Sequence, residues 1–405
     1  MVLGVAIGLG PGPRIVSGTA TAAETIAGIN GVAPPLGIRH VGVATLASTS
    51  DDAMVAGVLS DLGVFWAATL PAIFLQPLVP LAGGYVSIDS TAISGTSYCV
   101  TSPDQISGNA YFCPSGDAIV YDSAGLIPVL IGHYGIAGLT AAFAHEFGHA
   151  IQARIGPTPA DRTEHPELYP TILIEAQGDC FTGAFLSWAV AGRAEHVRLP
   201  ESSMVRAVAP LLDFGDPVTV PVGDATAHGL ALDRLTDLLL GYRQGAAACH
   251  GLTRAALTPT LGRAGLIDIP GADRFRGPAD TLAAARTSVA SFLTKVLPGR
   301  DSAASSQPSA LDLTAAQPYG QFAAAATVAL SAGRSVTGSA IGAACFTGAW
   351  TGSVFGHQRA GALGSWGGDA DEALNMLRAR PSANLRELAA YADGFTKGWA
   401  ACAPR

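Results

Sequence analysis

The chain has 405 residues, of which 49% are apolar and 13% are charged, and its formal net charge is −8. This composition supplies a sizeable core and is not that of a disordered chain. Because Lys and Arg form no basic run, we exclude the clustered positive charge that nucleic-acid binding requires and expect no nucleic-acid partner. The length allows one large or two medium domains.

The first 49 residues predict a leader followed by a flexible lead-in. Residues 2–10 are apolar but too short to span a bilayer, and Ala20-Thr21-Ala22 fits the A-x-A pattern that signal peptidase cleaves. No Lys or Arg precedes the apolar run, which leaves two alternatives: a sequence start that is placed late, or a Gly/Ala-rich leader without an export role. We favour export.

The apolar run from Leu62 to Leu81 contains Pro71, Pro77 and Pro80. Prolines at this spacing disfavour a straight membrane helix, so we predict a core helix with a buried loop and no transmembrane span in this chain. The pattern then changes to strands. Residues 111–113 and 118–121 flank a turn-rich stretch and predict a β-hairpin.

The sequence His145-Glu146-Phe147-Gly148-His149 has the spacing of a metal-binding helix. Positions i and i+4 share one helix face, so two imidazoles can hold one ion, and Glu146 can take a proton from water beside it. The flanks support a helix, because apolar residues recur every three or four positions and Gly156-Pro157 supplies a stop. Two surface histidines on an ordinary helix are the alternative.

A second predicted helix, begun by Pro170, carries the partner carboxylates. Glu175 and Asp179 lie one turn apart on one face. Glu175 can complete a His, His, Glu ligand set for Zn²⁺, and Asp179 can accept a hydrogen bond from a ligand histidine and fix its tautomer. The two helices together favour a metal site over accidental spacing.

The stretches HEFGHAIQ and EAQGDCFTGAF resemble the neutral zinc metallopeptidases of bacteria, whose pattern is an HExGHHxQ helix followed by an ELQADC-type helix. The resemblance extends to segments near 61–66, 111–114, 120–122, 227–234 and 241–249, and so covers roughly residues 50–250. One departure is visible, since Ala150 stands where the family usually has a further histidine. The side chain of Ala150 lies on a different face of the helix from the two histidines, so this departure should not affect the metal site.

This resemblance implies an α+β, mostly helical fold: a gluzincin-like peptidase domain with a small antiparallel sheet whose hairpin borders the substrate groove. It implies a bacterial zinc hydrolase acting on peptides or proteins, with Glu146 as general base. By its match to the family pattern, His228 becomes the candidate donor to the developing oxyanion, and Arg234 a residue that orients it or pairs behind it. A helix-capping or surface role is the alternative for His228.

Six cysteines form three predicted disulfides. Cys99 and Cys113 flank a short polar loop, which favours a local bridge. The other pairs follow from an internal repeat, because CFTGAF at Cys180 recurs as CFTGAW at Cys345, and a glycine-led segment ends at Cys249 and again at Cys402. We therefore predict the bridges Cys180–Cys249 and Cys345–Cys402. An even, pairable set indicates an oxidising compartment.

The repeat predicts that residues 251–405 are a degenerate second copy of the 50–250 domain. Aligning Gly148 with Gly333 places Leu330 and Arg334 where the two histidines stand, and Ala340 and Ala344 where the carboxylates stand. The second copy therefore has no predicted metal ligands. A helical extension with accidental similarity is the alternative. We expect a flexible loop over 298–317.

Three functions remain open from the sequence. The first is a zinc-dependent peptidase. The second is a catalytically weak or inactive zinc-bearing scaffold of the cell envelope, with the repeat as an interaction surface. The third is an aminopeptidase or amidase that acts on an envelope substrate. Peptide specificity and oligomeric state are not specified by any pattern in the sequence.

Overall fold

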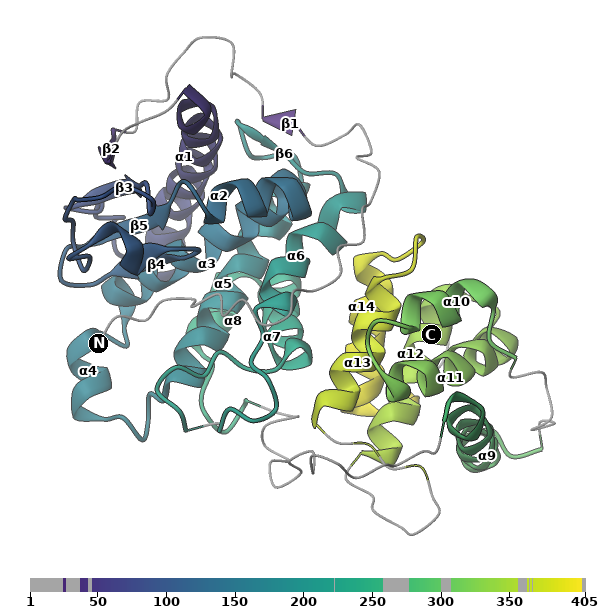
Figure 1. The fold of residues 1–405 in the computed structure, drawn as a ribbon. Coiled ribbons are helices and arrows are strands. Elements are labelled where there is room, and N and C mark those ends of the chain that lie inside the picture. Colours follow the sequence, from purple (N-terminus) through teal and green to yellow (C-terminus); the bar gives the residue numbers. More distant parts are fainter. Residues whose placement is uncertain are drawn as a thin grey trace. The chain divides into compact units, whose positions relative to one another are not determined.

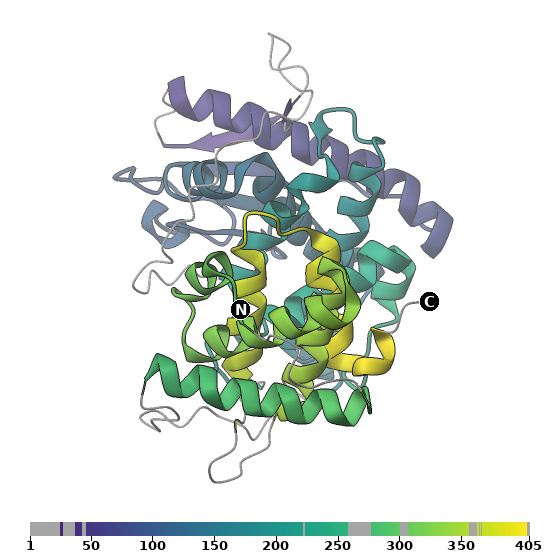
Figure 2. The ribbon, with the colours of Figure 1, turned by 90° about the vertical axis from the view of Figure 1, so that its right-hand side faces the viewer.

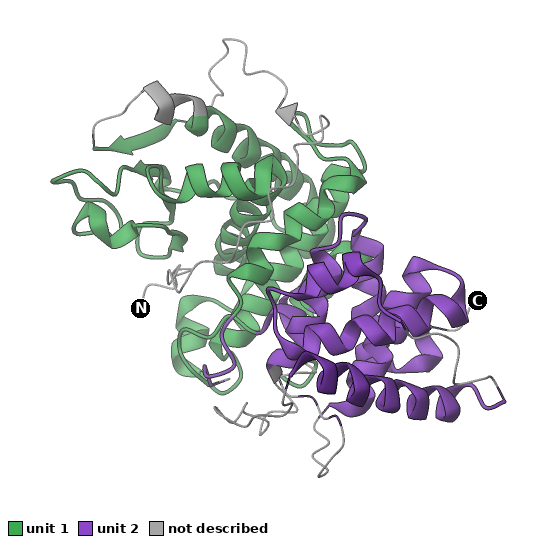
Figure 3. Ribbon diagram, turned by 45° about the vertical axis from the view of Figure 1, so that its right-hand side comes forward, with its two compact units in different colours: residues 1–215, 223–229, 237–257 green, residues 216–222, 230–236, 258–405 purple. Residues whose placement is uncertain are grey.

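The computed structural model describes residues 25–26, 37–42, 46–221, 223–257, 277–299, 307–355, 363, 365 and 367–402. The predicted cleavage site at residues 20–22 lies outside them. The chain divides into two compact units, shown in Figure 3: unit 1 comprises residues 1–215, 223–229 and 237–257, and unit 2 comprises residues 216–222, 230–236 and 258–405. The predicted 50–250 domain thus lies in unit 1 except for two short segments.

Most described residues are helical (Figure 1). The helices and helical turns of unit 1 are α1 (Leu46–Phe74), η1 (Pro103–Ile106), α2 (Leu126–Val129), η2 (Leu130–Tyr134), α3 (Gly135–Ile155), α4 (Pro159–Glu164), α5 (Thr171–Val190), η3 (Glu201–Ser203), α6 (Met204–Asp213) and α8 (Ala246–His250). α7 (Ala231–Gln244) begins in unit 2 and continues in unit 1. Unit 2 contains α9 (Pro278–Val296), α10 (Ala310–Ala316), α11 (Gln321–Thr337), α12 (Ala340–Val354), α13 (Gly367–Arg378), α14 (Leu385–Lys397) and η4 (Trp399–Ala401).

A four-stranded sheet lies in unit 1, in the order β2 (Ile38–Val41), β3 (Gly84–Ile88), β5 (Ala118–Asp122) and β4 (Ala110–Cys113). The predicted hairpin is confirmed as the antiparallel pair β4–β5. The predicted antiparallel sheet is wrong, because β2, β3 and β5 are parallel. α1 is the crossover that returns the chain to pair β3 alongside β2, as parallel neighbours require. The predicted lead-in therefore supplies a strand. A separate short pair joins β1 (Thr25–Ile26) to β6 (Val197–Arg198).

α1 is fixed within unit 1 by two buried carboxylates. Asp52 accepts hydrogen bonds from the hydroxyls of Tyr121 and Ser87 in the sheet. Asp61 is fully buried and accepts backbone N–H groups from residues 195–197. A buried carboxylate is costly without such partners, so both groups fix the position of α1 against the sheet and the β6 segment.

Two helical stretches, Asp51–Phe74 and Leu126–Ile155, are long and apolar enough to cross a membrane by length and composition, and 56% of each tested window is buried within the protein. Such a test is also met by the core helices of soluble proteins. The predicted core helix is present as α1, which continues through Pro71 to Phe74. The loop that follows is not buried as predicted, since Leu75 is 89% exposed and Val79 is 58% exposed.

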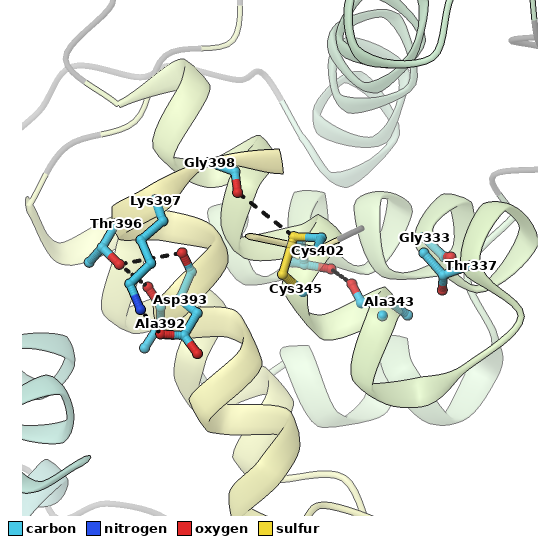
Figure 4. The surroundings of a disulfide bond; sticks show 12 residues. Gly333, Thr337, Ala343, Cys345, Ala392, Asp393, Thr396, Lys397, Gly398 and Cys402 are labelled. Atoms are coloured by element: carbon cyan, nitrogen blue, oxygen red, sulfur yellow. Dashed lines mark hydrogen bonds and ion pairs between the residues drawn. A yellow bond between two sulfur atoms is a disulfide. The ribbon is translucent and has the colours of Figure 1, made fainter. Parts of the chain in front are cut away.

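All three predicted disulfides are present, and no cysteine is free. Cys180–Cys249 joins α5 to α8 in unit 1, and Cys345–Cys402 joins α12 to the residue after η4 in unit 2. Figure 4 shows the second bridge, where the sulfur of Cys402 faces the carbonyl of Gly398. In unit 1 the sulfur of Cys249 faces the carbonyl of Gly245 in the same way.

The close helix crossing inside unit 1 and the one inside unit 2 occur at equivalent positions of the repeat. In unit 1 a Cβ atom at Gly183 would lie 1.9 Å from the carbonyl oxygen of Leu238, and one at Gly241 would lie 1.7 Å from that of Cys180. In unit 2 a Cβ at Gly348 would lie 2.0 Å from the oxygen of Tyr391, and one at Gly394 would lie 2.1 Å from that of Cys345. In both units two helix backbones are in contact at a pair of glycines, at the sequence positions that the repeat aligns.

The predicted flexible loop over 298–317 is wrong in part, because α10 occupies its end. Ser309 caps this helix by accepting the N–H of Asp312. Asp312 in turn accepts from the guanidinium of Arg334 on α11. These contacts cap and anchor a helix of only seven residues.

Candidate metal centre

The two helices of the predicted motif, α3 and α5, pack closely because glycines face each other where they meet. A Cβ at Gly148 would lie 3.3 Å from the Cα of Gly178. A Cβ at Gly178 would lie 3.1 Å from the ring of His145 and 3.2 Å from that of His149. The lack of a side chain at Gly178 therefore leaves the space that both imidazoles occupy.

Three ligand atoms converge at this contact. The Nε2 atoms of His145 and His149 lie 3.1 Å apart. The carboxylate of Glu175 places Oε2 3.1 Å from Nε2 of His145 and Oε1 3.5 Å from Nε2 of His149. Zinc bonds of about 2.0–2.1 Å in tetrahedral geometry separate neighbouring ligand atoms by roughly 3.3–3.4 Å. The three residues therefore fit a metal ion, and the structure brings together the ligand set that the sequence predicted.

Each histidine has a partner on its far nitrogen. Nδ1 of His145 lies 2.8 Å from Oδ1 of Asp179, as the sequence predicted. Nδ1 of His149 lies 2.9 Å from Oε1 of Gln152, which sequence reasoning missed. When Nδ1 carries the proton, the Nε2 lone pair is directed at the ion, so both partners select the ligating tautomer. The signal for Gln152 was its spacing, since position i+3 shares the helix face of His149.

The amide of Gln152 is oriented by its own contacts. Its Nε2 donates to the carbonyl of Ile174, at 2.8 Å, and to Oε1 of Gln177, at 3.1 Å. Both acceptors lie on α5, so the amide oxygen is left to face His149. Arg162 of α4 also donates to that oxygen, at 3.3 Å. Burial lowers the pKa of Arg162 to about 10, against the opposing effects of Glu175 and Asp161.

The charges of the site attract a cation. Burial lowers the pKa of His145, but the carboxylates of Asp179 and Glu175 outweigh burial and raise that pKa to about 10. Burial likewise raises the pKa of Glu175, and the imidazoles of His149 and His145 outweigh it and hold the pKa well below its usual range. The negative charge that retains a proton on His145 also favours a metal ion in its place.

Glu146 points at the edge of the sheet. Its Oε2 accepts the backbone N–H of Phe112 on the edge strand β4, at 3.1 Å, and the side chain is buried. Burial raises the pKa of Glu146, while the two ligand histidines and the Phe112 N–H oppose that rise. A carboxylate with a raised pKa next to a metal position is the usual arrangement of a general base.

The structure leaves the two remaining predictions open. His228 is half-buried in the segment before α7, which is held near the start of α5 by a hydrogen bond from Thr171 to the carbonyl of Ala225. Arg234 is 1% exposed in the first turn of α7. The predicted oxyanion role of His228 and the supporting role of Arg234 stay predictions.

The corresponding positions of unit 2 carry a different chemistry. Leu330 is fully buried where unit 1 has its first histidine, and Ala344 is fully buried where unit 1 has Asp179. Arg334, at the position of the second histidine, forms an ion pair with Asp312. Within the residues that the structure describes, the His145, His149 and Glu175 group is the one set of three metal-ligand side chains that converge.

A Gln152→Leu variant is expected to bind zinc roughly 10–100-fold more weakly, because the His149 ring loses the acceptor that fixes its tautomer. Competition with a chromophoric chelator measures the affinity. Gln105→Leu is the matched control, since Gln105 is exposed in the helical turn η1 and its side chain bonds to Thr101, away from the proposed ligands. Equal affinity in the two variants would contradict a role for Gln152.

These contacts define a His, His, Glu group that could hold a metal ion. The outer nitrogen of His149 is hydrogen-bonded to Gln152, and that of His145 lies 2.8 Å from the carboxylate of Asp179. Comparison of the chain with protein-family models, with curated proteins and with solved structures gives no match in any of the three.

Proposed function

We propose that this protein is a zinc-dependent peptidase. The observation that supports the proposal most strongly is the convergence of three ligand atoms within 4.8 Å of one another. Two imidazoles and one carboxylate are the donor set of zinc hydrolases, which leave a coordination position for water and substrate. Glu146 neighbours this group, and β4 is the edge strand of the sheet, to which an extended peptide could add once the segments that cover it move.

In the proposed hydrolysis, the ligands, the general base and the residues that orient the histidines have separate roles. Zinc, when bound by His145, His149 and Glu175, supplies Lewis-acid chemistry that acidifies water and polarises a carbonyl group. Glu146 takes a proton from the attacking water and returns it to the nitrogen of the leaving amine, so that its carboxylate is regenerated. Asp179 and Gln152 hold the histidine rings in place throughout.

One observation favours the second candidate, a zinc-bearing scaffold with weak or no turnover. His145 and Glu175 are each 1% exposed, and Glu146 is 3% exposed. Substrate reaches such a site only if neighbouring segments move. The same metal chemistry in an aminopeptidase or amidase remains the third candidate.

Metal content and turnover together test the proposal. We expect about one zinc per chain in purified protein, hydrolysis of a mixed peptide library, loss of both on treatment with a chelator, and recovery on adding zinc. Product mapping separates internal cleavage from release of single N-terminal residues. Bound zinc without turnover on any peptide or amide would identify the scaffold instead.

We further propose that unit 2 is a degenerate copy of the helical part of unit 1. The matched glycine crossings and matched disulfides support it. Three disulfides also support export to an oxidising compartment.

A further inference from the structure

The end of α1 and the segment after it form an exposed apolar surface in unit 1. From Leu62 to Ile88 the sequence has no Asp, Glu, Lys, Arg or His. Residues 71–73, 75–77, 79 and 80 are exposed, and we call them the 71–80 surface. Within it Leu75 is 89% exposed and Val79 is 58% exposed. Large apolar side chains at this exposure, close together in sequence, indicate a contact surface.

A cavity of about 330 Å³ adjoins this surface through Ile73. Phe65, Trp188 and Tyr242 contribute aromatic rings to its lining, and Arg193 and Arg243 contribute guanidinium groups. Its described lining includes no acidic residue. None of the proposed metal ligands lines it, so this cavity is separate from the metal centre.

Exposed apolar side chains, aromatic rings and arginines together are typical of a surface that binds a membrane interface. Tryptophan and tyrosine rings favour the headgroup level, and arginine pairs with lipid phosphate through several donors. Both arginine side chains are exposed. Although the chain carries a net charge of −8, the described lining of this cavity includes two arginines and no acidic residue. Its charge is therefore complementary to anionic headgroups.

The backbone of the 71–80 surface also suits a low-polarity environment. Pro71, Pro77 and Pro80 lack an N–H group. The carbonyls of Val79 and Pro80 accept from Arg154 at the end of α3. Three residues of this segment thus have no N–H group, and two of its carbonyls are bonded without water.

We propose that the 71–80 surface, with the adjoining arginines, docks unit 1 on an anionic phospholipid surface. The contact is peripheral. α1 cannot cross the bilayer without breaking the buried hydrogen bonds of Asp52 and Asp61, which lie inside the same helix. Figure 2 shows α1 as a long purple helix whose last turns extend past the neighbouring helices of unit 1.

Sedimentation with vesicles tests the proposal on the full chain. We expect binding to phosphatidylglycerol vesicles and at least tenfold weaker binding to phosphatidylcholine vesicles. Leu75→Asp/Val79→Asp should reduce binding by more than about tenfold, because each change removes an exposed apolar contact and adds a repelled charge. Arg193→Gln should reduce binding to the anionic vesicles by roughly fivefold and leave binding to neutral vesicles unchanged.

The matched control is Ile341→Asp, which removes another exposed apolar side chain, 45% exposed, on α12 of unit 2. It should bind vesicles like the unmodified protein. Circular dichroism and zinc content confirm that each variant is folded. Equal binding to both lipids, equal loss in the Ile341 variant, or no vesicle binding together with a dimer that Leu75→Asp/Val79→Asp abolishes would each overturn the proposal.

Discussion

Replacing Glu146 by glutamine is expected to lower peptide hydrolysis by about 10²–10⁴-fold while zinc stays bound. Glutamine keeps an oxygen that can accept the N–H of Phe112, so the local structure should survive. It cannot take a proton from water. The metal ligands His145, His149 and Glu175 are unchanged, so zinc content should stay near one per chain.

Hydrolysis rate and zinc content measured on the same preparation separate these effects. Glu164→Gln is the matched control, because Glu164 ends α4 and is exposed. It should keep the activity of the unmodified protein. Turnover in the Glu146 variant equal to that of the control would refute the general-base role and leave the metal centre without an assigned reaction.

Replacing Gly241 by alanine is expected to destabilise unit 1 by about 3 kcal/mol or more, or to prevent its folding. The new methyl group would lie 1.7 Å from the carbonyl oxygen of Cys180, so α5 and α7 must separate. α5 carries Glu175, and we expect zinc binding to weaken together with stability. Urea unfolding followed by circular dichroism measures the change.

Gly63→Ala is the control for that experiment. Gly63 lies inside α1, and nothing stands within 4 Å of an added Cβ. Alanine there should stabilise the protein by about 0.5–1 kcal/mol, because it favours the helix. If both glycine variants unfold at the same urea concentration, the helices do not cross as closely as described.

The metal ligands could be predicted from sequence because helix geometry alone places them. The i, i+4 spacing sets His145 and His149 on one face, and the same spacing sets Glu175 and Asp179 on another. The disulfide Cys99–Cys113 followed from its short polar loop, and the other two followed from the repeated cysteine segments.

Other features depend on contacts between distant segments, which no local pattern encodes. β2 is a strand because it pairs with β3, although the 29 residues of α1 lie between the two strands in the sequence. The hydrogen bond from Phe112 to Glu146 uses a backbone N–H, which every residue but proline possesses. Residue spacing in the sequence therefore predicted the candidate metal ligands. It did not predict that the edge strand β4 lies beside Glu146.

The paired crossings have a consequence for how the protein melts. Units 1 and 2 share the same close packing of helices at glycine. Among the residues that the structure describes, the candidate metal ligands lie in unit 1, and unit 2 has Leu330 and Ala344 at corresponding positions. When no ion is bound, the burial of His145, His149 and Glu175 destabilises unit 1 and not unit 2. Stripping the metal should therefore split thermal denaturation into two steps, with the ligand-bearing half unfolding first and the other half serving as an internal reference.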